Sequence, residues 1–449
     1  MNLFLDFGVP PWLGFGAPPW AFGLALIALI IGIGWRWPLL LLALALASLA
    51  IRPELLFGGH FVGWRWELHH TLMVLALTAS AWRFGLQKSI PWPIAALALS
   101  AALSLLFGRL HPHVGPGLVV ESLVLLSLPF AFTQISLPLR TRSVLAPLIM
   151  ALPLLSTAIG AALQIAGLHV TFAHLHDRLE GATGNAGVFG LLAFCGLAVA
   201  LHEISRQKYP SAILPAALNL ALVVFSGSRS AMLASGLLLI AYPLASAPFR
   251  SQLRQRPLVM STGAILAAGI SVAYLPKIYE RLHLKMDRFR VWNVFYDEFL
   301  KSPVFGRGSG AGLVAGDLWP ADVERPFLTI PHNEYLHLLV NGGMIGFALC
   351  LAAIIYWYYR SIRLTSAPDR CFLIALAPAL AAFAVTENIL IHAYSLGLFV
   401  YIGLLDRPET SAALGSMGTR APTESGSAGD GAEDKEERSW ADGAPPRPQ

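Results

Sequence analysis

The residues of this chain best suited to chemistry are arginines and histidines gathered around one long loop, residues 276–331, and its exit. Arginine guanidinium groups pair bidentately with phosphate oxygens, so a strongly basic loop favours an anionic ligand. Between residues 277 and 307 the only acidic residues are Glu280, Asp287, Asp297 and Glu298, against a larger basic set of Lys277, Arg281, Lys285, Arg288, Arg290, Lys301 and Arg307.

The loop ends in two histidines that open the next apolar stretch, in the run Pro331-His332-Asn333-Glu334-Tyr335-Leu336-His337. Histidine is the expected general base or proton carrier near neutral pH. His332 lies at the mouth of the stretch and His337 more than a helical turn deeper, so either is a candidate base, with Asn333 or Glu334 to orient it. The alternative is a pair of interfacial histidines satisfied by their neighbours. Glu387 and Asn388 interrupt the last apolar stretch and are candidates to line the same cavity.

Three further features could bind an anion. Residues 279–300 can form an amphipathic helix whose basic face includes Arg288, and Arg288 and Arg290 are the best candidates for a cationic wall against a lipid diphosphate. Ser226-Gly227-Ser228-Arg229-Ser230 joins two apolar stretches with almost no loop, which favours either a phosphate-binding or a snorkelling Arg229. Arg178 and the residues up to Asn185 are typical of a polar cap at a helix start. For residues 279–300, the alternative to a diphosphate-binding wall is a helix that lies in the lipid headgroup region.

These residues must be positioned by membrane helices. The 449 residues are 56% hydrophobic and only 13% charged, far below the charge of a soluble domain. We predict an all-α polytopic membrane protein with about 12 to 13 transmembrane helices, because the apolar runs have the length that crosses a bilayer. The predicted spans are 18–35, 37–52, 67–84, 90–108, 117–135, 143–167, 184–202, 211–226, 229–247, 257–275, 333–359, 371–386 and 388–405. The first two touch at Arg36-Trp37-Pro38 and could be one broken helix.

The basic residues between spans predict the orientation, since cytoplasmic loops carry the excess of lysine and arginine. Alternate loops hold Arg83 and Lys88, Arg140 and Arg142, Arg206 and Lys208, Arg250 to Arg256, and Arg360 to Arg370. The long loop then faces outward, together with the turn at 226–229 and residues 386–388. We predict a membrane domain at residues 1–407 and a disordered cytoplasmic tail at 408–449, with no cleaved signal peptide.

Several other classes of site are not favoured. The net charge of +5 reflects membrane orientation, and we expect no nucleic-acid partner. Three cysteines and the loosely spaced His174, His176 and Asp177 do not make a metal site or a disulfide framework, so we predict neither metal nor cofactor. The run Gly306–Gly312 lacks the ending of a P-loop and suggests a flexible chain reversal.

Taken in order, four motifs are similar to the O-antigen ligase/polymerase superfamily, and most closely to the lipopolysaccharide O-antigen ligases. They are Arg178-x-x-Gly181-x-x-Gly184-Asn185, Ser226-Gly-Ser-Arg229-Ser, a long outer loop with Arg288 and Pro303-Val-Phe-Gly306-x-Gly308-x-Gly310, and His332-Asn333 followed by Gly343-x-x-Gly346.

The resemblance implies a metal-independent glycosyltransferase in the bacterial inner membrane. Its partners would be an undecaprenyl-diphosphate-linked glycan as donor, lipid A–core as acceptor, and membrane lipids. The functional residues it implies are Arg229, Arg288 and His332, while His337 and Arg290 compete with their neighbours for the same roles. An O-antigen polymerase, a protein O-oligosaccharyltransferase and a lipid-linked glycan transporter are the alternatives, in that order.

Overall fold

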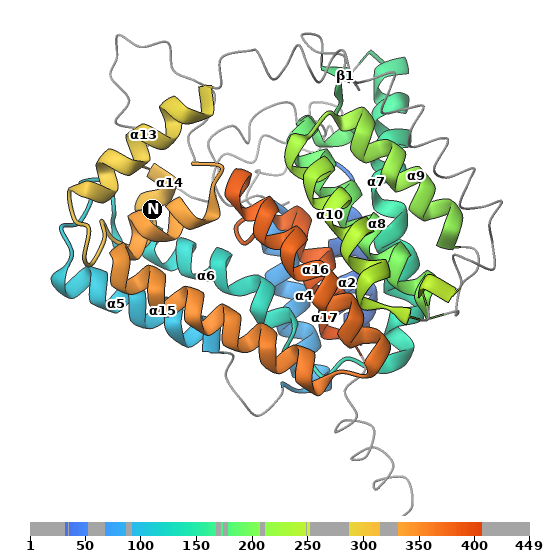
Figure 1. Cartoon of the computed structure of the whole chain (residues 1–449), viewed down its shortest axis with the longest axis horizontal. Helices are drawn as coiled ribbons and strands as arrows, with labels where there is room; N and C mark the ends of the chain where they lie inside the picture. The colour runs from blue at the N-terminus through green and yellow to red at the C-terminus, as the bar shows by residue number, and fades with distance from the viewer. Residues whose placement is uncertain are drawn as a thin grey trace, which may run out of the picture. The chain divides into compact units, whose positions relative to one another are not determined.

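A computed structural model describes residues 32–34, 36–52, 68–86, 92–167, 172–173, 178–206, 212–247, 249–251, 287–314 and 331–405 (Figure 1). The described residues, up to Leu405, belong to one compact unit. The predicted spans 257–275 and most of 18–35, much of the long loop, and the predicted tail lie outside the described residues.

The described chain is almost entirely helical, as predicted. The helices are α2 (Pro38–Ser48), α4 (Leu68–Phe84), α5 (Trp92–Phe107), α6 (Pro116–Phe132), α7 (Arg142–Ile165), α8 (Ala186–Ser205), α9 (Ile213–Ser226), α10 (Arg229–Ala245), α13 (Asp287–Leu300), α14 (Ala311–Val314), α15 (Glu334–Leu364), α16 (Ala367–Thr386) and α17 (Leu396–Gly403). Short 3-10 turns η2 (Leu139–Thr141), η3 (Gly181–Thr183) and η6 (Ala393–Ser395) lie between them, and β1 (Phe172–Ala173) pairs antiparallel with β2 (Arg178–Leu179).

Four of the described helices, α7, α8, α15 and α16, are long and apolar enough to cross a membrane. Shorter apolar helices include α2, α5, α6, α9 and α10. Each predicted span within the described residues has an apolar helix in the structure, so the helical membrane fold is supported while the total number of spans stays a prediction.

Helix α8 is the centre of the packing. It lies beside α7, α9 and α10. Of the 18 residues that make up its most apolar stretch, 83% are buried, about twice the buried share in α7, α15 and α16. Small residues allow this close approach, because a Cβ on Gly190 would lie 2.5 Å from Cβ of Ser228 and one on Gly196 would lie 2.8 Å from Oδ1 of Asn219. Around this centre, α10 lies along α16 and α5 along α15 (Figure 1).

The helix ends sort into two groups that follow the predicted alternation of basic and outward loops. The starts of α8, α10 and α15 and the end of α16 meet at one end, which we call the His332 end. The starts of α7 and α16 and the ends of α8 and α17 meet at the other, the Arg142 end. The end of α4 joins the Arg142 end, because the backbone N–H of Ser136 donates to the carbonyl of Gly85 (3.2 Å).

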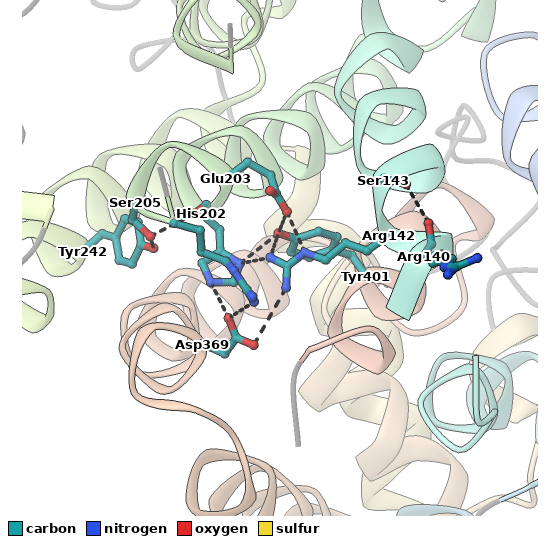
Figure 2. Close-up of polar contacts among 10 residues, drawn as sticks. Arg140, Arg142, Ser143, His202, Glu203, Ser205, Tyr242, Asp369 and Tyr401 are labelled. Atoms are coloured by element: carbon teal, nitrogen blue, oxygen red, sulfur yellow. Dashed lines mark hydrogen bonds and ion pairs between the residues drawn. The ribbon is translucent and has the colours of Figure 1, made fainter. Parts of the chain in front are cut away.

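A buried charged network holds the Arg142 end together (Figure 2). Arg142 donates to Oε1 of Glu203 (2.7 Å) and to the Tyr401 hydroxyl (2.5 Å). Arg206 donates to Oδ1 of Asp369 (2.7 Å). Buried charges persist only when they are paired, and here two arginines meet two carboxylates. Glu203 and Asp369 lie just beyond the predicted spans 184–202 and 371–386, in the turns by which α8 and α16 extend past those spans.

Candidate active site

The glycine-rich segment of the long loop, from Pro303 to Gly312, is joined by backbone hydrogen bonds to a break in α15. Gly343 has φ of 63° and ψ of −166° inside the helix, a conformation open to glycine. The break frees backbone groups of α15, and the segment pairs with them. Arg307 N donates to the Val340 carbonyl (2.8 Å), and Met344 N donates to the Pro303 carbonyl (2.8 Å). Non-helical backbone inside a membrane protein requires such pairing. The segment is therefore a fixed anchor, and the expectation of a flexible reversal was wrong.

A buried ion pair fastens the end of α13 to the same anchor. Glu298 is 3% exposed, and Arg307 donates to it from Nε (3.1 Å). Burial alone would raise the pKa of the Glu298 carboxyl, but the neighbouring Lys301 and Arg307 outweigh it and lower the pKa. Arg307, predicted as part of the basic loop, is thus only 5% exposed, and its guanidinium is paired with Glu298.

The apolar face of α13 places its start beside the start of α15. Val291 and Phe295 pack in one buried cluster with Leu336 and Val340. Trp292 adds a directed contact, since its indole Nε1 donates to the carbonyl of Pro331 (2.8 Å). The amphipathic helix predicted at 279–300 is confirmed over its described part, and its packing brings Arg288 to the residues just before α15.

Arg288 and His332 meet on one carboxylate, that of Glu387. Arg288 Nη2 lies 2.6 Å from Oε1 of Glu387, and His332 Nδ1 lies 2.7 Å from Oε2. Arg288 also donates through Nη1 to the carbonyl of Thr386. The Glu387 side chain is 8% exposed, the His332 side chain 14% and the Arg288 side chain 37%, so the two basic groups extend from a buried carboxylate toward the surface.

The carboxylate stays ionised because of these neighbours. Burial would raise the pKa of Glu387, but the hydrogen bond with His332 and the charge of Arg288 outweigh it and lower the pKa to about 2. His332 itself has φ of 46°, an uncommon conformation for a residue other than glycine, and one that recurs where structure holds a functional side chain in place.

Three helix starts surround this group, each capped by a side chain. Asn185 accepts from Gly187 N (2.8 Å) at α8, Ser228 from Ala231 N (3.4 Å) at α10, and Asn333 from Leu336 N (3.0 Å) at α15. A Cβ on Gly187 would lie 3.5 Å from Oε1 of Glu387. Helix starts carry partial positive charge, so the site favours anions.

The predicted arginines at 178 and 229 lie by these helix starts. Arg178, in β2, donates from Nε to the carbonyl of Ser226 (2.9 Å), the last residue of α9. Arg229 is the first residue of α10 and is exposed. The next residue, Ser230, accepts a hydrogen bond from the Thr386 hydroxyl (2.6 Å), so the α10 start lies directly beside the Arg288–Glu387 pair. Arg290 lies in α13, but its side chain is outside the described part of the structure.

The structure separates the two candidate histidines. His337 is fully buried against Gly312, where a Cβ would lie 2.6 Å from Nδ1 of the histidine. Neither ring nitrogen has a hydrogen-bond partner among the described residues. Nδ1 of His332, in contrast, contacts one oxygen of the Glu387 carboxylate, and Arg288 contacts the other oxygen.

The group that orients His332 is not one of the two predicted for the role. Asn333 caps α15 instead. Glu334 accepts from the backbone N–H of Leu390 (2.9 Å) and so fixes the turn after Glu387. Glu387 was predicted only as a cavity-lining residue; the sequence signal was an acidic residue interrupting an apolar stretch, and the contact with His332 appears only in the structure.

No group of three or more His, Cys, Asp or Glu side chains able to hold a metal occurs among the described residues, and the run from His174 to Asp177 lies outside them. What the site offers is a histidine with a carboxylate behind it, three arginines and several helix starts, a combination suited to proton removal beside a phosphate-like anion.

Part of the chain matches a known family. Residues 214–351 match the family model Wzy_C, described as O-antigen ligase. The match confirms the resemblance drawn from the ordered motifs. It contains Arg229, Arg288, His332 and His337 and ends before Glu387. No curated protein matches the chain.

Proposed function

We propose that this multi-pass membrane protein is an O-antigen ligase. It would transfer a glycan from undecaprenyl diphosphate to a sugar hydroxyl of lipid A–core, with inversion at the anomeric carbon. The Wzy_C match supports a ligase or polymerase of this family. An O-antigen polymerase, whose acceptor is another carrier-linked glycan, is the alternative that the experiment below separates.

One observation carries the proposal: Glu387 joins Arg288 to His332 beside three helix starts. With Nδ1 of His332 on the carboxylate, a neutral imidazole donates its Nδ1–H to Glu387 and leaves the lone pair on Nε2. Nε2 then takes the proton of the acceptor hydroxyl as that oxygen attacks the anomeric carbon. The carboxylate stabilises the imidazolium that forms, and Glu387 thereby acts as a positioning residue.

The leaving group is a lipid diphosphate, which gains negative charge as its bond to the anomeric carbon breaks. Arg288, Arg229 and the starts of α8, α10 and α15 place fixed positive charge where that charge develops, the kind of stabilisation that usually contributes most to catalysis. Arg290 and Arg178 are assigned supporting roles in holding the diphosphate, and Asn333 acts through the start of α15. In this proposal arginines neutralise the diphosphate, and no metal is required.

The orientation is part of the proposal. Several of the basic residues predicted to be cytoplasmic lie at the Arg142 end. Turns predicted to face outward lie at the His332 end. The active site would then face the periplasm from the inner membrane, where the carrier-linked glycan and the acceptor are both presented.

The test uses purified full-length protein in detergent, with undecaprenyl-diphosphate glycan as donor and chelator throughout. One reaction contains lipid A–core and a second contains no acceptor. Variants His332→Ala and Arg288→Gln are compared with His113→Ala and Arg109→Gln, which remove the same groups from exposed positions. We expect transfer to lipid A–core, reduced roughly 10²–10⁴-fold in the two site variants and unchanged in the two controls.

Other outcomes would redirect the proposal. Longer carrier-linked glycans in the reaction without acceptor would identify a polymerase. A product that keeps the anomeric configuration of the donor would exclude the single displacement. Transfer that appears only in a parallel reaction without chelator would show that the arginines do not suffice.

A further inference from the structure

A second candidate site lies at the opposite end of α4 from the His332 site. A cavity of about 430 Å³ opens where α2 begins and α4 ends, lined by Arg36, Arg83, Trp37, Phe84 and the first turn of α2. The other end of α4 contacts the His332 end, where His70 Nε2 lies 3.1 Å from the carbonyl of Ile391. Some 17 residues of helix separate the two places, which is about 25 Å.

Two guanidinium groups line this cavity and have no partner among the described residues. Arg36 and Arg83 are both exposed, and no hydrogen bond or ion pair joins either side chain to another described residue. Two like charges on one cavity repel each other, and an anion between them removes that repulsion. A phosphate oxygen pair also matches the planar fork of a guanidinium.

The rest of the lining is apolar and aromatic. Trp37 is 57% exposed and Leu40 47% exposed, and Phe84 with Leu39 completes the wall. Trp82, next to Arg83, is 76% exposed. Exposed tryptophan beside arginine is typical of the level of lipid headgroups. A free phosphate ion would use the arginines alone, whereas a phospholipid would also cover the apolar wall.

We propose that the Arg36–Arg83 cavity binds the phosphate of an anionic phospholipid in the leaflet at the Arg142 end. That leaflet is the predicted cytoplasmic one, whose surface is rich in anionic lipid. The bound lipid would link the start of α2 to the end of α4. This site is separate from the proposed donor site and does not depend on the proposed function.

The test is lipid binding to purified full-length protein, measured by native mass spectrometry. The probes are phosphatidylglycerol, phosphatidylcholine of the same acyl chains, and inorganic phosphate as a competitor. The cavity variant is Arg36→Gln/Arg83→Gln. Its matched control is Arg140→Gln/Arg363→Gln, which removes two exposed arginines of the predicted cytoplasmic loops that do not line the cavity.

We expect one tightly retained phosphatidylglycerol per chain, about tenfold or more weaker in the cavity variant and nearly unchanged in the control. Phosphatidylcholine should bind more weakly, and millimolar inorganic phosphate should not displace the lipid. Equal loss in the control variant would overturn the proposal in favour of general surface attraction. Full displacement by inorganic phosphate would overturn the lipid assignment.

A second measurement places the lipid. Bromine quenches tryptophan fluorescence at short range, so brominated phosphatidylglycerol should quench wild-type protein more than Trp37→Phe protein. Equal quenching of the two would mean that the lipid lies elsewhere.

Discussion

Replacing Glu387 by glutamine tests the central contact of the site. Glutamine keeps the shape of the side chain but removes its charge, and its amide can present a donor to Nδ1 of His332 where the carboxylate accepts. We expect the glutamine variant to fold and to bind the donor, but to lose most of its rate, because the imidazolium formed during proton transfer is left without its counter-charge.

The structure gives the size of this effect. The pKa of Glu387 falls from 4.5 to about 2, and a fall of that size corresponds to roughly 3 kcal/mol of net attraction between the carboxylate and its cationic neighbours. Arg288 is 37% exposed, so solvent screens its share and His332 carries the larger part. Only the part of this attraction that grows as His332 becomes an imidazolium lowers the barrier, so we expect a loss of roughly 1.5–3 kcal/mol, which lowers kcat by about 10- to 10²-fold.

The assay is steady-state transfer by purified protein, with kcat and KM for the donor measured separately. The loss should appear mainly in kcat, since the protonated base exists only as the reaction proceeds. Asp297→Asn is the matched control, because it makes the same charge change at an exposed position of α13. Glu387→Asp retains the charge on a shorter side chain, so its kcat should lie between those of Asp297→Asn and Glu387→Gln. A folded Glu387→Gln protein with kcat within about threefold of wild type would refute the role of Glu387.

Four further outcomes are expected. Arg288→Lys should lower kcat/KM by about tenfold, because an ammonium cannot serve both Thr386 and Glu387 in the geometry of a guanidinium; unchanged transfer would argue against a bidentate role. His337→Phe should keep kcat within about threefold, since the ring fills a buried space beside Gly312; a loss of 10²-fold would make His337 the base instead. Gly343→Ala should lower stability by more than about 2 kcal/mol in thermal unfolding, because its Cβ would lie 2.5 Å from Gly306 N at a positive φ; an unchanged melting temperature would contradict the fixed anchor. The folded-state pKa of Glu387 lies below the ordinary value of 4.5, so the stability that its charge adds over Glu387→Gln should be complete above about pH 4.5 and disappear as pH falls toward about 2; a difference that persists at pH 2 would contradict this.

Local sequence signals predicted the helices well because their causes are local. An apolar stretch in a bilayer must satisfy its own backbone, and a helix does so within the stretch. The cap at Asn185 was visible for the same reason, since its side chain accepts from the N–H of Gly187, two residues away. The count of spans stayed open at Arg36-Trp37-Pro38, where no local signal separates one broken helix from two.

The amino-acid sequence by itself determined the material of the active site: a basic loop, a histidine at a helix mouth and arginines at tight turns. It did not decide which histidine contacts the carboxylate of Glu387, nor that Arg307 forms an ion pair with Glu298. Those outcomes depend on contacts between residues far apart in the chain, such as His332 with Glu387 across 55 positions. Only the tertiary structure, by packing α13 on α15 and fastening both at the Gly343 break, brings Arg288, His332 and Glu387 to one place.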